Sequence, residues 1–214
     1  MNKIKLILVC FVGLTSLNAL ELSPEVTSQI EKCRAGTVKS CYEVGITLTT
    51  GENAQNQEKK DLGLEYIRRA CTHGLDTACD ALGDNYYGNK HYQAARPLFE
   101  QSCQRGILHA CEALGTMYRD GQDVRPNDVI SREYYEKACE LGSKDSCINV
   151  AIIYRGGFGV KKDRNMVKKY YKKACDAGST AGCNSFKTMD NKDKGIEEPS
   201  IFSKAWGTLK SLFN

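Results

Sequence analysis

The sequence predicts an all-α protein, a solenoid of stacked helix–turn–helix repeats with a disulfide at each junction. Five cysteine pairs share one pattern with seven residues between the cysteines: CRAGTVKSC, CTHGLDTAC, CQRGILHAC, CELGSKDSC and CDAGSTAGC. The first cysteines of successive pairs are 38, 32, 36 and 36 residues apart. A period of about 20–50 residues is typical of stacked repeats. Between the pairs, apolar residues recur with helical periodicity.

Residues 1–19 are predicted to be a signal peptide. Lys3 and Lys5 precede the nine-residue apolar run LILVCFVGL, and Ala19 offers a small residue for cleavage. This run is shorter than the ~20 residues that cross a bilayer, so we expect no transmembrane segment after cleavage. A lipoprotein attached through Cys10 is disfavoured, because bulky Val9 precedes that cysteine. The expected location is secreted or periplasmic.

Residues 20–188 are predicted to form the repeats, each with two helices. In the fourth repeat the first helix carries an apolar stripe at i, i+3, i+4 and i+7, namely Cys147, Val150, Ala151 and Tyr154. Asp163 is placed to cap the second helix. That helix carries Val167, Tyr170, Tyr171 and Ala174 and ends after Cys175, at Gly178. Small residues four positions after a second cysteine favour close helix approach: Gly45, Gly83, Gly115 and Ala151. The loop 51–60 is longer than its equivalents, and the loop 87–90 is shorter.

The cysteines are predicted to form a disulfide framework. Signal cleavage removes Cys10 and leaves ten cysteines, an even number in an exported chain. Zinc binding is disfavoured, because zinc ligands usually follow the spacing C-x2–4-C. Each pair spans a turn between antiparallel helices, so nearest neighbours come within disulfide reach. The expected bridges, which require a thiol-oxidising pathway, are Cys33–Cys41, Cys71–Cys79, Cys103–Cys111, Cys139–Cys147 and Cys175–Cys183.

The C-terminal segment differs from the repeats. Residues 189–200 (MDNKDKGIEEPS) are predicted to be a polar linker, and residues 201–214 an amphipathic helix that starts after Pro199-Ser200. Its apolar residues share one face: Ile201, Phe202, Ala205, Trp206, Leu209, Leu212 and Phe213. This helix is interpreted as a cap over the end of the solenoid, or else as a docking helix for a partner or a membrane surface. Only Lys204 and Lys210 carry positive charge, which weakens the membrane interpretation.

Charge and motifs exclude several function classes. Cleavage of the signal lowers the formal charge from +4 to +2, because Lys3 and Lys5 are removed with no acidic residue, so we expect no nucleic-acid partner. The sequence has no S-x-x-K or K-T-G motif, and the bridges use every mature cysteine. His73, His91 and His109 form no metal-ligating motif, so surface or junction roles are expected. We therefore assign no catalytic residue, metal or cofactor.

A binding scaffold is the function that the residues favour. Such solenoids present their first helices as a groove. The positions of these helices outside the apolar stripe give a mixed polar surface suited to a peptide or protein partner, or else an ordinary solvated face. They are Asp80, Asp84, Asn85, Glu112, Thr116, Asn149 and Ile152.

One pattern recurs along the chain: a small residue and Cys, then Leu-Gly, Tyr, Gly, Val, Asp or Asn, Tyr-Tyr and Ala-Cys-x-x-Gly. This pattern resembles the Sel-like, tetratricopeptide-related repeats. With paired cysteines at every junction, the chain is similar to the Helicobacter cysteine-rich protein family. The likeness covers residues 24–188. It departs from the pattern in the shortened second repeat and after Cys183, where Ser185, Phe186 and Lys187 follow.

The resemblance carries expectations of its own. It implies a right-handed α-solenoid in the periplasm or the medium. Members of that family are also labelled as β-lactamases or penicillin-binding proteins. The resemblance therefore implies, as an alternative to the scaffold, binding of a β-lactam or a peptidoglycan-like ligand, or β-lactam hydrolysis.

Overall fold

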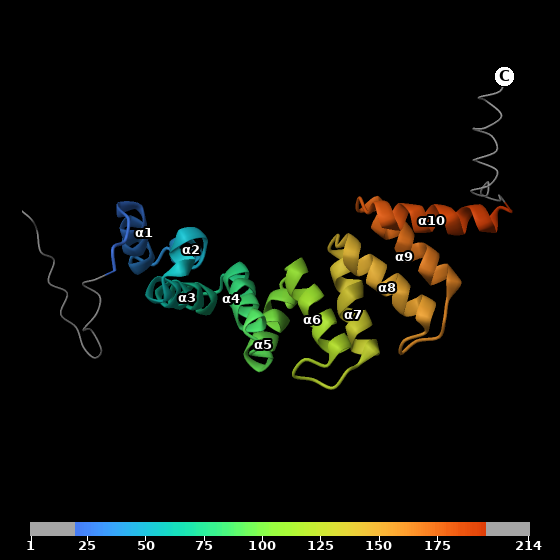
Figure 1. The fold of residues 1–214 in the computed structure, drawn as a ribbon, viewed down its shortest axis with the longest axis horizontal. Helices are drawn as coiled ribbons and strands as arrows, with labels where there is room; N and C mark the ends of the chain where they lie inside the picture. Colours follow the sequence, from blue (N-terminus) through green and yellow to red (C-terminus); the bar gives the residue numbers. More distant parts are fainter. Residues whose placement is uncertain (1–19, 196–214) are drawn as a thin grey trace, which may run out of the picture. The chain divides into compact units, whose positions relative to one another are not determined.

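The structure, a computed structural model, describes residues 20–195, and within them every regular element is a helix (Figure 1). The elements are, in order, α1 Pro24–Arg34, α2 Val38–Thr49, a 3-10 helix η1 Gly51–Gln55, α3 Gln57–Thr72, α4 Asp76–Gly88, α5 Tyr92–Gln104, α6 Leu108–Asp120, α7 Asp128–Glu140, α8 Lys144–Gly156, α9 Arg164–Asp176 and α10 Thr180–Asp193. Even-numbered helices are the first helices of the repeats, and odd-numbered helices are the second helices.

The chain divides into two compact units, with the boundary inside α4 after Leu82. The core of the first unit lies between α1 and α2, and α3 adds Leu62 and Tyr66 to its edge. The buried members of this core are Val26, Ile30, Val44 and Leu48. Each unit thus buries apolar side chains locally, between helices that are neighbours in the sequence, as expected for repeats.

The second unit has two core clusters built in the same way. One lies mainly between α5 and α6 and contains Phe99, Leu114 and Met117, each with no exposed surface. The other lies between α8 and α9 and contains Val150 and Tyr171. The tyrosine pairs Tyr134-Tyr135 and Tyr170-Tyr171 pack in these cores. Tyr135 and Tyr171 are buried, and Tyr134 and Tyr170 stack on Tyr118 and Tyr154 of the preceding helices.

Small residues let the two helices of a repeat approach closely. A Cβ atom added to Gly115 in α6 would lie 2.7 Å from the ring of Tyr135 in α7, and one added to Gly83 in α4 would lie 2.8 Å from the ring of Phe99. Real Cβ contacts do not become so short. In these two repeats the glycine four residues after the second cysteine therefore lets an aromatic ring of the second helix pack against the backbone of the first.

Side-chain caps and glycines set the helix ends. Asp163 accepts hydrogen bonds from the backbone N–H groups of Asn165 and Met166 and so caps α9, as predicted. Asn127 caps α7 in the same way. Gly121 and Gly157 adopt left-handed conformations after α6 and α8, which glycine tolerates best.

The predicted fold class is confirmed, since the chain is an all-helical stack of disulfide-stapled repeats. Each bridge joins the end of one helix to the start of the next, with Cα–Cα distances between 4.3 and 4.8 Å. The bonded pairs are Cys33–Cys41, Cys71–Cys79, Cys103–Cys111, Cys139–Cys147 and Cys175–Cys183. None of the helices in residues 20–195 is long and apolar enough to cross a membrane.

Two segments differ from the expectation. The long loop 51–60 holds η1 and the first turn of α3, because Asn56 caps α3 and Asn53 donates to the carbonyl of Thr47. Helix α10 continues to Asp193, inside the predicted linker 189–200, because Asp190 and Asp193 face basic residues of α9. The predicted signal 1–19 and amphipathic helix 201–214 lie outside the described residues.

Candidate binding surface

The seven predicted groove residues lie on the first helices α4, α6 and α8, as expected. Asp80 belongs to the first unit, and the other six belong to the second. Asn85 and Asn149 are half-buried, whereas Ile152 is 36% exposed and offers an apolar contact. Asp84, Glu112 and Thr116 are engaged in contacts between helices.

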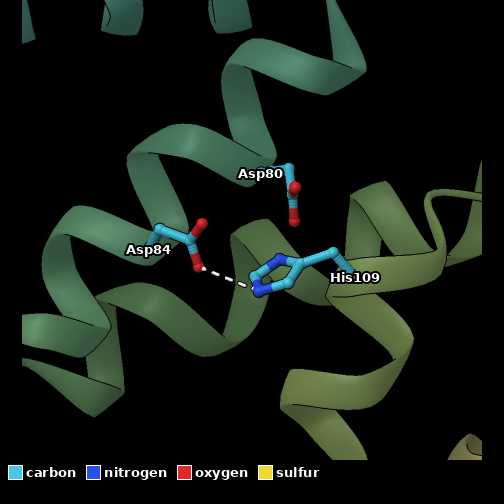
Figure 2. A group of neighbouring side chains, drawn as sticks. All are labelled: Asp80, Asp84 and His109. Atoms are coloured by element: carbon cyan, nitrogen blue, oxygen red, sulfur yellow. Dashed lines mark ion pairs between the residues drawn. The ribbon is translucent and has the colours of Figure 1, made fainter. Parts of the chain in front are cut away.

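Asp84 of α4 forms an ion pair with His109 of α6, with 3.6 Å between Oδ1 and Nε2 (Figure 2). Both side chains are about half exposed, at 51% and 50%. His109 thus has the junction role expected of it. Asp80 stands one turn earlier on α4. Exposed carboxylates beside a histidine are common without an ion, and we assign no metal to this pair.

Glu112 and Thr116 of α6 hold neighbouring helices in place. The Glu112 carboxylate accepts hydrogen bonds from the hydroxyls of Ser143 and Ser146, with 3.0 Å to the second, and so ties α6 to the start of α8. The Thr116 hydroxyl lies 3.0 Å from that of Tyr135. These two predicted groove residues therefore contribute to helix packing.

A cavity of about 560 Å³ lies between α8, α9 and α10 in the second unit and is called here the α8–α10 cavity. Its apolar wall is formed by Val167 and Tyr171, which are buried, and by Met189, which is half-buried. The side chains of Asn184 and Thr188 add polar groups from α10.

Exposed basic residues form one edge of this cavity, called here the basic edge: Arg155, Lys162 and Arg164. Arg155 donates to the hydroxyl of Tyr171 over 3.3 Å, which holds its guanidinium beside the apolar wall. Asp163 also lines the cavity, but its carboxylate is occupied by the cap of α9.

Ion pairs between α9 and α10 fix one side of the cavity. Asp193 accepts from Lys168 and from Arg164, each over 2.7 Å, and these two cations lower the pKa of its carboxyl to about 2. Lys194 and Lys168 likewise lower the pKa of Asp190. The contacts hold α10 against α9, so the wall of the cavity is set by the fold.

A polar cluster beside the cavity is structural. The Glu136 carboxylate accepts from the hydroxyls of Tyr154 and Tyr170, over 3.2 and 3.1 Å, and from Arg132 over 2.8 Å. Burial, with the nearby Glu136 carboxylate, raises the pKa of Tyr170. Its phenol therefore stays protonated and donates to Glu136.

Sequence reasoning placed the candidate surface on the first helices and missed the α8–α10 cavity. Tyr154 and Val167 stood out only as apolar stripe positions, and nothing in a linear pattern shows that they share a hollow with Met189. One signal was available, because basic residues gather at the turn between α8 and α9: Arg155, Lys161, Lys162 and Arg164.

The family model described as Sel1 repeat matches residues 38–75, 108–143 and 144–179, which together are more than half of the chain. Each matched range holds one first helix and one second helix. The unmatched pair is α4 and α5, where the loop is shortened. Comparison with curated proteins finds no match.

Several solved structures are similar in fold. The chain shares 24% identity and a TM-score of 0.69 with the protective antigen c5321 of uropathogenic Escherichia coli, over 87% of this chain and 40% of that one. A Sel1 repeat protein from Oxalobacter formigenes shares 19% identity and a TM-score of 0.64, over 80% and 77%. Helicobacter pylori cysteine rich protein B shares 22% identity and a TM-score of 0.31, over 75% and 93%. The chain thus spans less than half the length of the antigen.

Proposed function

Because the chain belongs to the Sel1 repeat family, whose repeats are generally protein-interaction modules, we propose that it is a scaffold for an extended peptide segment of a partner protein. The binding site is the α8–α10 cavity. The observation that carries this proposal is the pairing of a buried apolar wall with an exposed basic edge in one hollow.

The chemistry of the cavity defines the kind of segment that fits. Ligand pockets in proteins are typically about 300–1,000 Å³ and combine apolar walls with a few placed polar groups. The wall formed by Val167, Tyr171 and Met189 accepts an apolar side chain. Arg155 and Lys162 favour a carboxylate beside that side chain. The ligand is therefore an acidic segment with one apolar anchor, or a C-terminal carboxylate next to an apolar residue.

Five disulfides indicate an extracytoplasmic protein, because such bonds persist in oxidising compartments. We propose further that the protein is secreted to the periplasm or the medium through the signal peptide 1–19. We therefore expect the partner protein to be exposed in the same compartment.

Peptide selection followed by affinity measurement tests the proposal. We expect a library displayed against the mature, oxidised protein to yield acidic peptides with an apolar anchor. Arg155→Ala combined with Lys162→Ala is expected to weaken their binding by tenfold or more, since each removed charge–carboxylate contact is worth about 1 kcal/mol or more. Lys161→Ala is the matched control, because Lys161 shares the loop but does not line the cavity. Equal losses from both changes would contradict the site.

The family resemblance implies a different function, β-lactam hydrolysis. The same protein preparation can be assayed for this activity, which distinguishes a hydrolase from a scaffold. All ten mature cysteines lie in bridges, and the sequence holds no S-x-x-K motif that would activate a serine. We expect no turnover of a chromogenic cephalosporin. A rate proportional to the amount of pure protein would favour the hydrolase and count against the scaffold.

A further inference from the structure

We propose that the bridge Cys175–Cys183 is a redox switch for the α8–α10 cavity, which a dithiol reductant opens while the other four bridges stay closed. Opening of this bridge releases α10 from α9 and removes one wall of the cavity. The proposal rests on the peptide site proposed above and concerns its regulation.

The last bridge is more exposed than the others. The eight cysteines of the first four bridges are buried, with at most 8% of their surface exposed. Cys175 and Cys183 are half-buried instead. Thiol–disulfide exchange requires a thiolate to reach a sulfur of the bridge, so its rate depends on access. A reductant in solution therefore attacks Cys175–Cys183 before the bridges that are enclosed between helices.

Helix α10 has fewer other contacts than the first helices before it. Helix α6 packs between α5 and α7, and α8 packs between α7 and α9, whereas α10 packs chiefly against α9. Helix α8 buries Val150, Ala151 and Ile153 of its apolar side. In α10, whose residues are all described, Gly182 alone is buried. Apolar burial, which holds the earlier first helices in place, thus contributes little at α10.

The buried contact of α10 lies beside the bridge. A Cβ atom added to Gly182 would lie 2.7 Å from the Cβ atom of Ala174, so the backbones of α9 and α10 approach closely there. Farther along α10, Lys168 pairs with Asp190 and Asp193 over 2.9 and 2.7 Å, and these side chains are between 26% and 37% exposed. Ion pairs that water reaches are weak individually. They orient α10 on α9 but do not hold it there once the bridge opens.

The helix that the bridge holds forms one wall of the cavity. Asn184, Thr188 and Met189 of α10 line the cavity, and Asn184 directly follows Cys183. When α10 leaves α9, Met189 no longer faces Val167, and the enclosed apolar site becomes an open surface. A peptide anchored by an apolar side chain needs that enclosure, so it binds the reduced form weakly.

The reaction balances with a dithiol as the reductant. One thiolate of the dithiol attacks a sulfur of the bridge and forms a mixed disulfide, and the other cysteine leaves as a thiolate that takes up a proton. The second thiol of the reductant then attacks the mixed disulfide, so the dithiol ends as a disulfide and Cys175 and Cys183 end as thiols. In the oxidising compartment proposed for this protein, the expected reductant is the Cys-x-x-Cys pair of an exported oxidoreductase.

Stepwise reduction of the mature, oxidised protein tests the access to this bridge. Dithiothreitol is added, free thiols are blocked with N-ethylmaleimide at timed intervals, and the labelled peptides are mapped by mass spectrometry. We expect Cys175 and Cys183 to be labelled at least about tenfold faster than the cysteines of the first four bridges, because buried sulfurs exclude the attacking thiolate. Equal rates for all five bridges, or earlier labelling of another pair, would overturn the proposal.

Variants of two bridges test the consequence for the cavity. Cys175→Ala combined with Cys183→Ala should weaken binding of a selected acidic peptide by about tenfold, as selective reduction does, and should remove the effect of dithiothreitol. Cys103→Ala combined with Cys111→Ala is the matched control, because that bridge joins α5 to α6, which do not line the cavity. This control should bind as the parent protein does and lose binding on reduction. Unchanged affinity of the first variant, with its helical content preserved by circular dichroism, would contradict the switch.

Hydrogen–deuterium exchange distinguishes this proposal from the peptide site. Selective reduction of Cys175–Cys183 should speed amide exchange in α10, residues 180–193, and leave α5 and α6 unchanged. This measurement needs no peptide, so it decides on the switch even where no peptide binds the oxidised protein and the proposed function fails. Unchanged exchange in α10 after reduction would overturn the switch and leave the peptide site standing.

Discussion

At the scale of single residues, the ion pairs of Asp193 give the contact between α10 and α9 a dependence on pH. This carboxyl has a folded-state pKa of about 2, because Lys168 and Arg164 donate to it, against about 3.9 for an unfolded aspartate. A lowered pKa contributes stability that is fully present above the unfolded value and is lost as the pH falls toward the folded value.

The predicted consequence is a fall in the free energy of unfolding between about pH 4 and pH 2 that depends on this carboxyl. Asp193→Asn should lower stability at neutral pH and flatten that part of the profile. Denaturant titrations across the pH range measure both effects. Asp176→Asn is the control, because Asp176 pairs with Lys172 on its own helix and joins no second helix. Identical profiles for the two variants would contradict the role of Asp193.

At the scale of helices, the small residues at the repeat contacts determine how closely a pair packs. Gly115→Ala places a methyl group 2.7 Å from the buried Tyr135 ring, and such overpacking should cost about 1–3 kcal/mol. Gly88→Ala, at the end of α4, meets no atom within 4 Å and should not lower stability. Chemical denaturation of the two variants compares the same substitution in both settings. A Gly115→Ala variant as stable as Gly88→Ala would show that the repeat does not require the close approach.

The junction disulfides also act at this scale. Cys139→Ala combined with Cys147→Ala removes a bridge across a short turn and should lower the free energy of unfolding by roughly 2–3 kcal/mol on the chain-entropy model. The fold should survive, because stability in a repeat stack is approximately a sum of unit and neighbour terms. Circular dichroism and denaturant unfolding check both statements. Complete unfolding of the variant, or an unchanged melt, would contradict this division of stability.

Sequence periodicity predicted the helices and the bridges because both depend on contacts between residues close in the chain. The cap at Asp163 and the close approach at Gly115 could be read from local patterns for the same reason. The end of α10 could not be predicted in this way, since ion pairs from α9 extend this helix to Asp193 through a segment of polar composition. The role of Glu112 and the presence of the α8–α10 cavity could not be predicted either, because both depend on side chains brought together from different helices.

At the scale of the molecule, the two units differ in what they offer a partner. The first unit buries its apolar residues between α1, α2 and α3. The second carries the α8–α10 cavity and the basic edge beside it. A stack of similar repeats thus gains a distinct site through changes at a few positions, since Val167 in α9 occupies the place that Ser131 holds in α7.

Hydrogen–deuterium exchange of the full oxidised chain, with and without a selected acidic peptide, tests the peptide site most directly. If the α8–α10 cavity binds the peptide, amide exchange should slow in segments 154–167 and 184–189, which contain most of its lining residues, and stay unchanged in residues 24–72 of the first unit. Protection confined to the first unit, or to the predicted groove positions Asp84, Asn85, Glu112 and Thr116, would contradict the account.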